Sequence, residues 1–514
     1  MGFARTIMVQ GTGSHVGKSV LVAALCRIFR QDGYAVAPFK AQNMALNSFV
    51  TRSGGEMGRS QVVQAQAAGV EPDVDMNPVL LKPTADTSSQ VIVQGRPIGN
   101  LSAFAYHLDY ANKVWPAIVE SFERLRRRYE IIVLEGAGSP AEVNLQERDV
   151  VNMRAARLAN APVLLAADID KGGALAAIVG TLELLRPGDR PLVAGTIINK
   201  FRGDRKLLQP ALDFLEEKTG VPVVGVIPYF TFKIPEEDTV NEELRPMKPQ
   251  GPQDPGPSLL EIAVLYLPHI SNFTDFDPLE REPDVHLRYV RPGEKIGRAD
   301  LVIIPGSKNT IGDLAQVRKN GWDKEILALA AAGVPVVGIC GGFQMLGMEI
   351  YDPDRVESPT GEAYGLALLE VTTVFRPEKT TWQAQGEVIG RGGLLEACRG
   401  QRVAGYEIHM GETYRGANAS PAFLLRRESN SQEPVLDGAV DGTGLVFGSY
   451  LHGLFDADGF RRAFLNRLRA SKGLPPLPVQ HHFAKSQEAA YDKLARLVRE
   501  NLDMNRIYQF LGLP

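Results

Sequence analysis

A cysteine on a predicted strand-to-helix turn is the first residue of this sequence whose surroundings fit catalysis. The apolar run at 334–339 ends at Cys340, and Gly341 and Gly342 follow it. Glycines allow a sharp backbone turn, and the N-terminus of the next helix favours the thiolate form of a cysteine. Hydrolases hold their catalytic serine on a turn of this kind. We therefore predict that Cys340 is a nucleophile rather than an inert buried thiol.

A thiolate nucleophile needs a proton-transfer partner, usually a histidine that folding brings near. His452 directly follows a predicted strand at 445–451, and a strand end holds a side chain more firmly than a loop does. His409 is the competing candidate. We predict His452 as the partner. Oxyanion donors are expected from backbone N–H groups of Gly341 and of Gly306, which lies in the turn after another strand.

A second chemical site is predicted at the N-terminus, where the strand 6–10 meets the loop GTGSHVGKS at 11–19 and a helix begins at once. The backbone N–H groups of such a loop and the open helix end attract phosphate. Lys18 would reach the outer phosphates of ATP, and the Ser19 hydroxyl would hold Mg²⁺. The loop has a Thr at position 12 and resembles that of the dethiobiotin synthetase class of ATPases. The predicted nucleotide contacts are Gly11, Thr12, Gly13, Gly17, Lys18 and Ser19.

Strands rich in Val, Ile and Leu alternate with helices through the first half, which predicts a parallel sheet with helices on both faces. Polar residues at the carboxyl ends of such strands lie on the ligand side of the sheet. Glu135 ends the strand 131–135 and is predicted to bind Mg²⁺ directly or through water; its alternative role is to cap a turn. Asn199 ends the strand 191–199 and is expected at the ATP site.

Substrate contacts are predicted where a polar stretch follows the strand 34–37 and beside the apolar residues 79–81. A solvated loop is an equally good interpretation of the polar stretch after 37. A lone lysine such as Lys82 is more often solvated than bound to a ligand. The residues concerned are Lys40, Asn43, Asn47, Ser48 and Lys82.

The chain of 514 residues exceeds what one hydrophobic core usually serves, so at least two domains are expected. Residues 245–258 are rich in proline and glycine, which predicts a linker between an ATP-binding domain at 1–244 and a second α/β domain at 259–514. The second domain ends in helices. One of them, at about 487–500, is amphipathic and is expected to pack on the sheet.

Bulk properties exclude several classes of protein. A net charge of −4 argues against nucleic-acid binding, and no apolar run is long enough to cross a membrane. The cysteines, Cys26, Cys340 and Cys398, have neither disulfide nor metal-ligand spacing, which fits a reducing cytoplasm.

Over nearly its whole length the chain resembles the cobyric acid synthase family, the glutamine-dependent corrinoid amidotransferases of cobalamin biosynthesis. The matching stretches are KAQNMALNS at 40–48, LLKPT at 80–84, EGAGSPAE at 135–142, NKFRGD at 199–204, NFTDFDP at 272–278, GICGG at 338–342 and GYEIHMG at 405–411. The resemblance implies an ATP-binding amidoligase domain followed by a class I glutamine amidotransferase domain with Cys340 and His452 as its catalytic pair.

The same resemblance implies the reaction. Glutamine is hydrolysed, ATP and Mg²⁺ activate a corrinoid carboxylate as an acyl phosphate, and ammonia displaces the phosphate. The family's substrate is adenosylcobyrinic acid a,c-diamide, amidated at carboxylates b, d, e and g. Many class I amidotransferases carry a carboxylate two residues after the histidine, whereas this chain has Leu454 there. What orients His452 is therefore open at this point.

Two alternatives differ in what the chain would do. A cobyrinic acid a,c-diamide synthase would share both domains and stop at two amides. A partitioning-type P-loop ATPase with an inactive glutaminase-like domain would act as a scaffold, but such ATPases usually carry a lysine early in the loop, where this chain has Thr12, Gly13 and Ser14, and they do not need Cys340.

Overall fold

The computed structural model describes residues 3–85, 88–102, 111–234, 259–358, 360–428 and 433–513. It divides into two units. Unit 1 comprises Met1–Ala45, Gly55–Asp238 and Gln487–Pro514, and unit 2 comprises Leu46–Gly54 and Thr239–Ser486. The predicted domain limit at 244 and the predicted linker at 245–258 lie outside the described residues.

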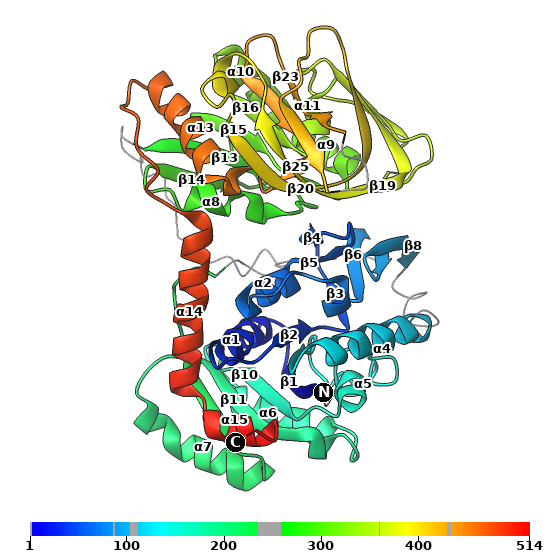
Figure 1. Ribbon diagram of the computed structural model, residues 1–514, viewed down its shortest axis with the longest axis vertical. Helices are drawn as coiled ribbons and strands as arrows, with labels where there is room; N and C mark the ends of the chain where they lie inside the picture. The colour runs from blue at the N-terminus through cyan, green and yellow to red at the C-terminus, as the bar shows by residue number, and fades with distance from the viewer. Residues whose placement is uncertain are drawn as a thin grey trace. The chain divides into compact units, whose positions relative to one another are not determined.

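Unit 1 is built on a six-stranded parallel sheet with the order β12-β11-β10-β1-β9-β2 (Figure 1). Every residue of β9 is buried, so both faces of the sheet are covered at its centre, as the continuous apolar runs predict. The strands are β1 Arg5–Gly11, β2 Val36–Phe39, β9 Ile131–Glu135, β10 Val163–Asp168, β11 Val193–Phe201 and β12 Val223–Pro228. The helices along this stretch are α1 Lys18–Gln31, α2 Arg59–Ala68, α4 Ala111–Arg128, α5 Met153–Ala159, α6 Ala174–Leu184 and α7 Arg205–Thr219.

The polar stretch after β2 contains more regular structure than its composition predicts. The short strand β3, Gln42–Met44, pairs with β6, Val79–Ala85, and β7, Ser88–Val93, and β8, Arg96–Ser102, complete this small sheet. Polar residues near β3 therefore stand on a sheet rather than on a free loop.

The C-terminal helices correct the predicted domain limits. From Gln487 onward, α14 (Phe483–Asn501) and α15 (Met504–Phe510) belong to unit 1, not to the second domain. The apolar side of α14 explains this, because Tyr491, Leu494 and Val498 are buried in one core cluster with side chains of α1. Apolar contacts over this distance in sequence are not visible in the local pattern.

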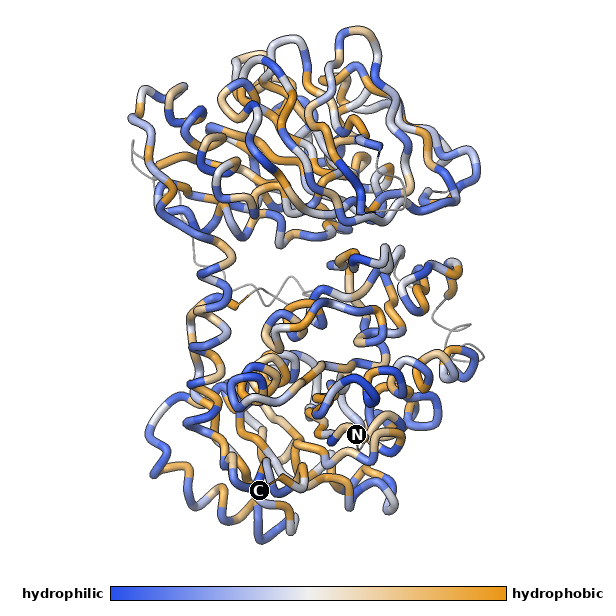
Figure 2. Tube along the Cα trace, viewed as in Figure 1, coloured by the Kyte–Doolittle hydropathy of each residue, from blue (hydrophilic) through white to orange (hydrophobic). Residues whose placement is uncertain are grey.

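Unit 2 has a second, mainly parallel sheet with the order β14-β13-β15-β16-β24-β23, in which only the edge strand β23 pairs antiparallel. Its strands are β13 Leu260–Leu265, β14 Val285–Val290, β15 Leu301–Ile304, β16 Val336–Ile339, β23 Ala439–Val440 and β24 Val446–Ser449. Packed with it are α9 Thr310–Lys319, α10 Trp322–Ala331, α11 Gly341–Leu346 and α13 Asp458–Ser471 (Figure 1). Figure 2 shows apolar residues along the inner strands of each unit and mostly hydrophilic outer loops.

A mixed sheet in unit 2 carries the remaining strands. Its long hairpin, β19 (Val371–Val388) and β20 (Arg402–Arg415), is extended by the two-residue strand β25, Leu451–His452. Smaller strands of this sheet are β17 Glu349–Tyr351, β18 Glu362–Tyr364, β21 Phe423–Arg427 and β22 Val435–Asp437. Within the described parts of the chain, none of the helices combines the length and the apolar character that crossing a bilayer requires.

Candidate active sites

Cys340 lies on the turn between β16 and α11, as the sequence predicts, and its backbone is strained. Its φ of 51° and ψ of −109° are rare for a residue with a side chain. Gly342, two residues after Cys340, has no room for a side chain, because a Cβ there would lie 1.9 Å from the carbonyl oxygen of Ile304. The sulfur is 3.6 Å from the Ile408 carbonyl oxygen, and only 7% of the residue is exposed. The Cys340 thiol is thus held on a tight, buried turn, and its role as a nucleophile stays a prediction.

His452 lies on β25 and is held by a carboxylate that the sequence analysis did not identify. Its Nδ1 is 2.7 Å from Oδ2 of Asp275, and the Gly453 N–H donates to Oδ1 of the same carboxylate at 3.0 Å. Asp275 lies in the short helix η4, Phe273–Phe276, within the NFTDFDP stretch. The carboxylate absent at position 454 is therefore replaced by one far away in sequence. The structure leaves no exposed surface on His452.

The protonation of His452 follows from these neighbours. Burial by itself lowers the pKa of this imidazole, but the charge and hydrogen bond of Asp275, together with a contribution from Cys340, raise the pKa to about 10. At neutral pH the ring therefore carries a proton. Asp275 orients the imidazole, and Cys340 is among the groups that raise its pKa. The roles of nucleophile for Cys340 and proton carrier for His452 stay predictions.

One ring contact and one nearby arginine support the position of the histidine. The ring of Tyr406 on β20 stacks against the imidazole, with centroids 5.3 Å apart and planes 20° apart. Downstream, the fully buried Arg461 donates to Glu282 at 2.7 Å and to the Phe455 carbonyl oxygen at 2.8 Å. Glu282 follows the helix of Asp275, and Phe455 follows His452. Arg461 therefore ties together the two chain segments that carry the pair.

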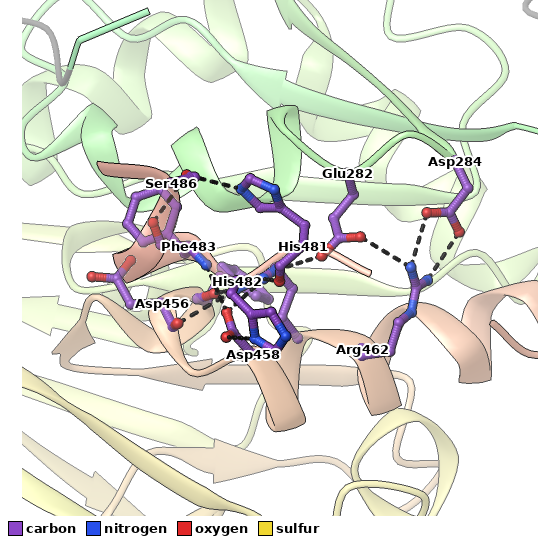
Figure 3. Close-up of polar contacts among 11 residues, drawn as sticks. Glu282, Asp284, Asp456, Asp458, Arg462, His481, His482, Phe483 and Ser486 are labelled. Carbon is purple, nitrogen blue, oxygen red and sulfur yellow. Dashed lines mark hydrogen bonds and ion pairs between the residues drawn. The ribbon is translucent and has the colours of Figure 1, made fainter. Parts of the chain in front are cut away.

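The residue after Arg461, Arg462, lies between two carboxylates (Figure 3). It donates to Glu282 at 3.1 Å and to both oxygens of Asp284 at 2.9 Å. Asp458 accepts from the Phe483 N–H at 3.0 Å, at the start of α14. Buried charges of both signs are paired here, as their burial requires.

His409, the competing candidate, lies in different surroundings. Its Nδ1 is 2.7 Å from the Gly411 carbonyl oxygen, and its ring stacks on Tyr450 at 3.7 Å. Its other nitrogen is 3.8 Å from Glu407. Burial alone would raise the pKa of Glu407, but hydrogen bonds from Arg427 and the proximity of His409 lower it to about 2. These contacts tie His409 to the hairpin β19–β20 and not to the thiol.

The two predicted oxyanion glycines lie in adjacent turns. A Cβ on Gly306 would be 3.2 Å from Cε1 of His452, and one on Gly341 would be 2.9 Å from the backbone nitrogen of Ser307. The turn after β15 thus packs directly against the turn of Cys340. The oxyanion role of both glycines stays a prediction.

The phosphate-loop residues of unit 1 have the geometry of an anion site. Gly17 has a φ of 95°, a conformation that favours glycine, and a Cβ there would lie 2.3 Å from Nδ2 of Asn199. That Asn199 amide donates to the Val16 carbonyl oxygen at 2.7 Å. Lys18 donates to the carbonyl oxygens of Gly13, at 2.8 Å, and Gly138, at 3.1 Å. Asn199 therefore supports the loop from the end of β11.

Glu135 collects several donors at the end of β9. The Ser19 hydroxyl and the Lys40 ammonium donate to its Oε1 at 2.6 and 2.8 Å, and the amide of Gln64 donates to its Oε2 at 2.6 Å. Burial alone would raise the pKa of Glu135, but Lys40 and the hydrogen bonds from Ser19 and Gln64 hold it below its usual value. Glu135 is thus an anion with its charge paired.

The residues at Glu135 fit a magnesium ion. Ser19 and Glu135 are oxygen ligands of the kind that Mg²⁺ takes, and P-loop proteins leave its remaining positions to phosphate and water. The amide oxygens of Gln61 and Gln64 are buried and have no hydrogen-bond partner within the described residues. Both amides donate to Glu135, so these oxygens are available to water bound to a cation. Sequence analysis missed both glutamines, because a polar helix face carries no motif.

The predicted substrate residues are divided between the two units. Lys82 forms a buried ion pair with Glu56 at 2.9 Å in unit 1, where Lys40 and Asn43 also belong. Asn47 and Ser48 belong to unit 2 and are 1% and 0% exposed. Their contacts there are to Phe273 and Asn272, beside the helix of Asp275. Substrate binding by these residues stays a prediction.

Comparison with known proteins matches each half of the chain to a known domain family. Residues 7–239 match the family described as CobQ/CobB/MinD/ParA nucleotide binding domain, and residues 261–460 match the CobB/CobQ-like glutamine amidotransferase domain. A cobyric acid synthase from Pelotomaculum thermopropionicum is 55% identical over 99% of this chain and 97% of its own length. One from Moorella thermoacetica is 54% identical, with 99% and 98% covered.

Proposed function

The chain belongs to the cobyric acid synthase family, and from that premise we propose that it uses ATP and glutamine to amidate carboxylates b, d, e and g of adenosylcobyrinic acid a,c-diamide. One observation supports this proposal above all others. The same chain carries the cluster of Cys340, His452 and Asp275 and, separately, a phosphate loop with Glu135. One cluster suits release of ammonia, and the other suits activation of an acid.

Glutamine hydrolysis would begin with attack of the Cys340 thiolate on the side-chain amide carbon. The resulting oxyanion would be stabilised by backbone N–H groups at Gly341 and Gly306. Protonated His452 would give its proton to the departing nitrogen, which leaves as ammonia and gives a thioester. His452 would then take a proton from water as the water attacks the thioester. The C–S bond breaks, glutamate leaves and gives its carboxyl proton to solvent, and the thiolate with protonated His452 is restored.

Activation of the corrinoid would take place in unit 1. A substrate carboxylate oxygen attacks the terminal phosphorus of ATP, which forms an acyl phosphate and releases ADP. Ammonia then attacks the acyl carbon, phosphate leaves, and the amide remains. Lys18 would contact the outer phosphates, and the backbone of Gly11, Thr12, Gly13 and Gly17 would contact the rest. Asn199 would act by holding the loop.

Ser19 and Glu135 would hold Mg²⁺, which when bound would neutralise charge on the transferred phosphoryl group. Lys40 would then be released from Glu135 and could bind a substrate carboxylate. Asn43 and Lys82 are the other residues that we propose for the anionic corrinoid. The three cysteines are free thiols, which supports a reducing, cytoplasmic location.

The test is to supply purified protein with ATP, Mg²⁺, the a,c-diamide and either glutamine or ammonium, and to weigh the corrinoid products by mass spectrometry. The proposal expects up to four new amides from either nitrogen source. Formation of the a,c-diamide from unamidated cobyrinic acid, with no further amidation, would assign the chain to the sibling enzyme. ATP hydrolysis without amidation of either corrinoid substrate would favour the scaffold ATPase.

A further inference from the structure

A short piece of the first half of the chain belongs to the glutaminase unit. Residues Leu46–Gly54, here called the inserted segment, belong to unit 2, while the chain on either side of them belongs to unit 1. Lys40 and Asn43 lie shortly before the segment, and Glu56 lies shortly after it. The covalent chain therefore runs from the proposed corrinoid residues into the glutaminase unit and back.

One end of the inserted segment holds the turn that carries Asp275. The backbone N–H of Ser48 donates to the Asn272 side chain at 2.9 Å, and the Phe273 N–H donates to the Asn47 side chain at 3.3 Å. Asn272 has a φ of 53°, a left-handed conformation that asparagine tolerates better than most residues. The helix η4 with Asp275 begins directly after it. The orientation of this carboxylate thus depends on Asn47 and Ser48.

The same segment holds the second support of the histidine. The Tyr406 hydroxyl donates to the Ser48 carbonyl oxygen at 3.0 Å, and the Phe49 ring meets the Tyr406 ring edge to face at 5.0 Å. Tyr406 in turn stacks on His452. Val50, Tyr406 and Ile408 form a small buried apolar cluster with Phe49 packed against it. Both groups that contact the imidazole, Asp275 and Tyr406, are therefore bound to Asn47, Ser48 and Phe49.

We propose that the inserted segment is a positioning element for His452, through which ATP and corrinoid bound in unit 1 raise the rate of glutamine hydrolysis in unit 2. The inference rests on the proposed function and extends it. Ligands that move Lys40 or Asn43 shift the backbone that continues into Asn47, and the shift reaches the imidazole through Asp275 and Tyr406. Such coupling requires that the ligands favour one arrangement of the segment over another.

The experiment compares two substitutions that each delete one hydroxyl. Tyr406→Phe keeps the ring on His452 and removes the hydrogen bond to the Ser48 carbonyl oxygen. Thr381→Val, the matched control, removes the hydrogen bond that Thr381 donates at 2.7 Å to the Gly54 carbonyl oxygen, at the other end of the segment. Asn47→Ala is a second test variant, which releases the Phe273 N–H.

The measured quantity is the kcat for glutamine hydrolysis with ATP, Mg²⁺ and the a,c-diamide, divided by the kcat without them. In the natural protein we expect this ratio to be about 5 or more. Tyr406→Phe and Asn47→Ala should each reduce it at least threefold, with less than a twofold change in the KM for glutamine. Amidation with free ammonium should stay unchanged in Tyr406→Phe and Thr381→Val, which also reports that unit 1 is folded. Thr381→Val should keep the natural ratio.

A ratio of 1 in the natural protein, while amidation with glutamine proceeds, overturns the coupling and leaves the proposed function intact. Equal loss in Tyr406→Phe and Thr381→Val overturns it as well, because the segment would then act only through general packing. If the natural protein amidates no corrinoid from either nitrogen source, the proposed function fails and the coupling fails with it.

Discussion

The predicted chemistry of His452 depends on one carboxylate, that of Asp275. Asp275 accepts from Nδ1 and from the next backbone N–H, so it fixes both the tautomer and the place of the ring. Replacing it with asparagine, Asp275→Asn, should reduce the kcat of glutamine hydrolysis by about 100-fold to 10,000-fold. Amidation with ammonium should be unchanged. Asp354→Asn, at an exposed position of the same unit, serves as control and should leave both rates unchanged.

The raised pKa of His452 also predicts how stability varies with pH. The ordinary pKa of histidine in an unfolded chain is about 6.5, and in the folded protein it is about 10. A raised pKa gives stability that is complete below the unfolded value and is lost as pH rises through the folded value. The melting temperature of Asp275→Asn should therefore lie furthest below that of the natural protein near pH 6. The gap should close towards pH 10, and a gap independent of pH would contradict this origin.

Lys18 is the residue whose loss should separate the two chemical sites. Lys18→Ala removes the ammonium expected at the outer phosphates, so amidation from either glutamine or ammonium should fall by about 100-fold or more. Part of the glutamine hydrolysis should persist, because Cys340 and His452 lie in the other unit. Product analysis with both nitrogen sources measures this, with Lys206→Ala, an exposed lysine, as control. Undiminished amidation in Lys18→Ala would contradict the assignment of this loop to the ATP site.

Among the elements, α13 has a structural role in the glutaminase unit. Its Arg461 is fully buried and bound to Glu282, Asp458 and backbone carbonyl oxygens. Arg461→Met leaves Glu282 with a buried charge and one partner fewer, so the free energy of unfolding should fall by about 3–5 kcal/mol. Urea denaturation measures it. Arg467→Met on the same helix loses only hydrogen bonds to a carbonyl and a hydroxyl, about 1 kcal/mol. Equal losses in the free energy of unfolding for Arg461→Met and Arg467→Met would contradict this structural role of Arg461.

The helix α14 makes a second prediction at this scale. Leu494 is fully buried in the core of unit 1, although it lies near the end of the chain. Leu494→Ala should lower the free energy of unfolding by about 2–5 kcal/mol, from lost burial and the cavity left behind. Arg496→Ala, on the exposed side of the same helix, should change it by about 0.5 kcal/mol or less. Comparable effects would mean that α14 is not part of that core.

The sequence predicts the limits of helices and strands better than it predicts contacts between residues far apart in the chain. The strands β1 and β9 begin and end within about a residue of their predicted limits, because buried parallel strands appear in sequence as continuous apolar runs. The sequence predicts no strand at β3, because the residues there are mostly polar. Asp275 was quoted in a family stretch but given no role, since no strand end marks its position.

At the scale of the whole molecule, two units exchange pieces of chain. The inserted segment leaves the first half of the sequence to join unit 2, and Gln487–Pro514 leaves the second half to join unit 1. A linear division at a proline-rich linker could not foresee either exchange, because each depends on contacts between residues far apart in sequence. The inserted segment links the proposed corrinoid residues to the supports of His452 by the covalent chain.

The two sites imply that one chain holds two separable reaction centres, with Cys340 serving only the release of ammonia. The most direct measurement is corrinoid amidation by Cys340→Ser, with glutamine and with ammonium, each with ATP and Mg²⁺. We predict loss of amidation with glutamine by about 1,000-fold or more and a rate with ammonium equal to that of the natural protein. Loss with both nitrogen sources, or with neither, would contradict the account.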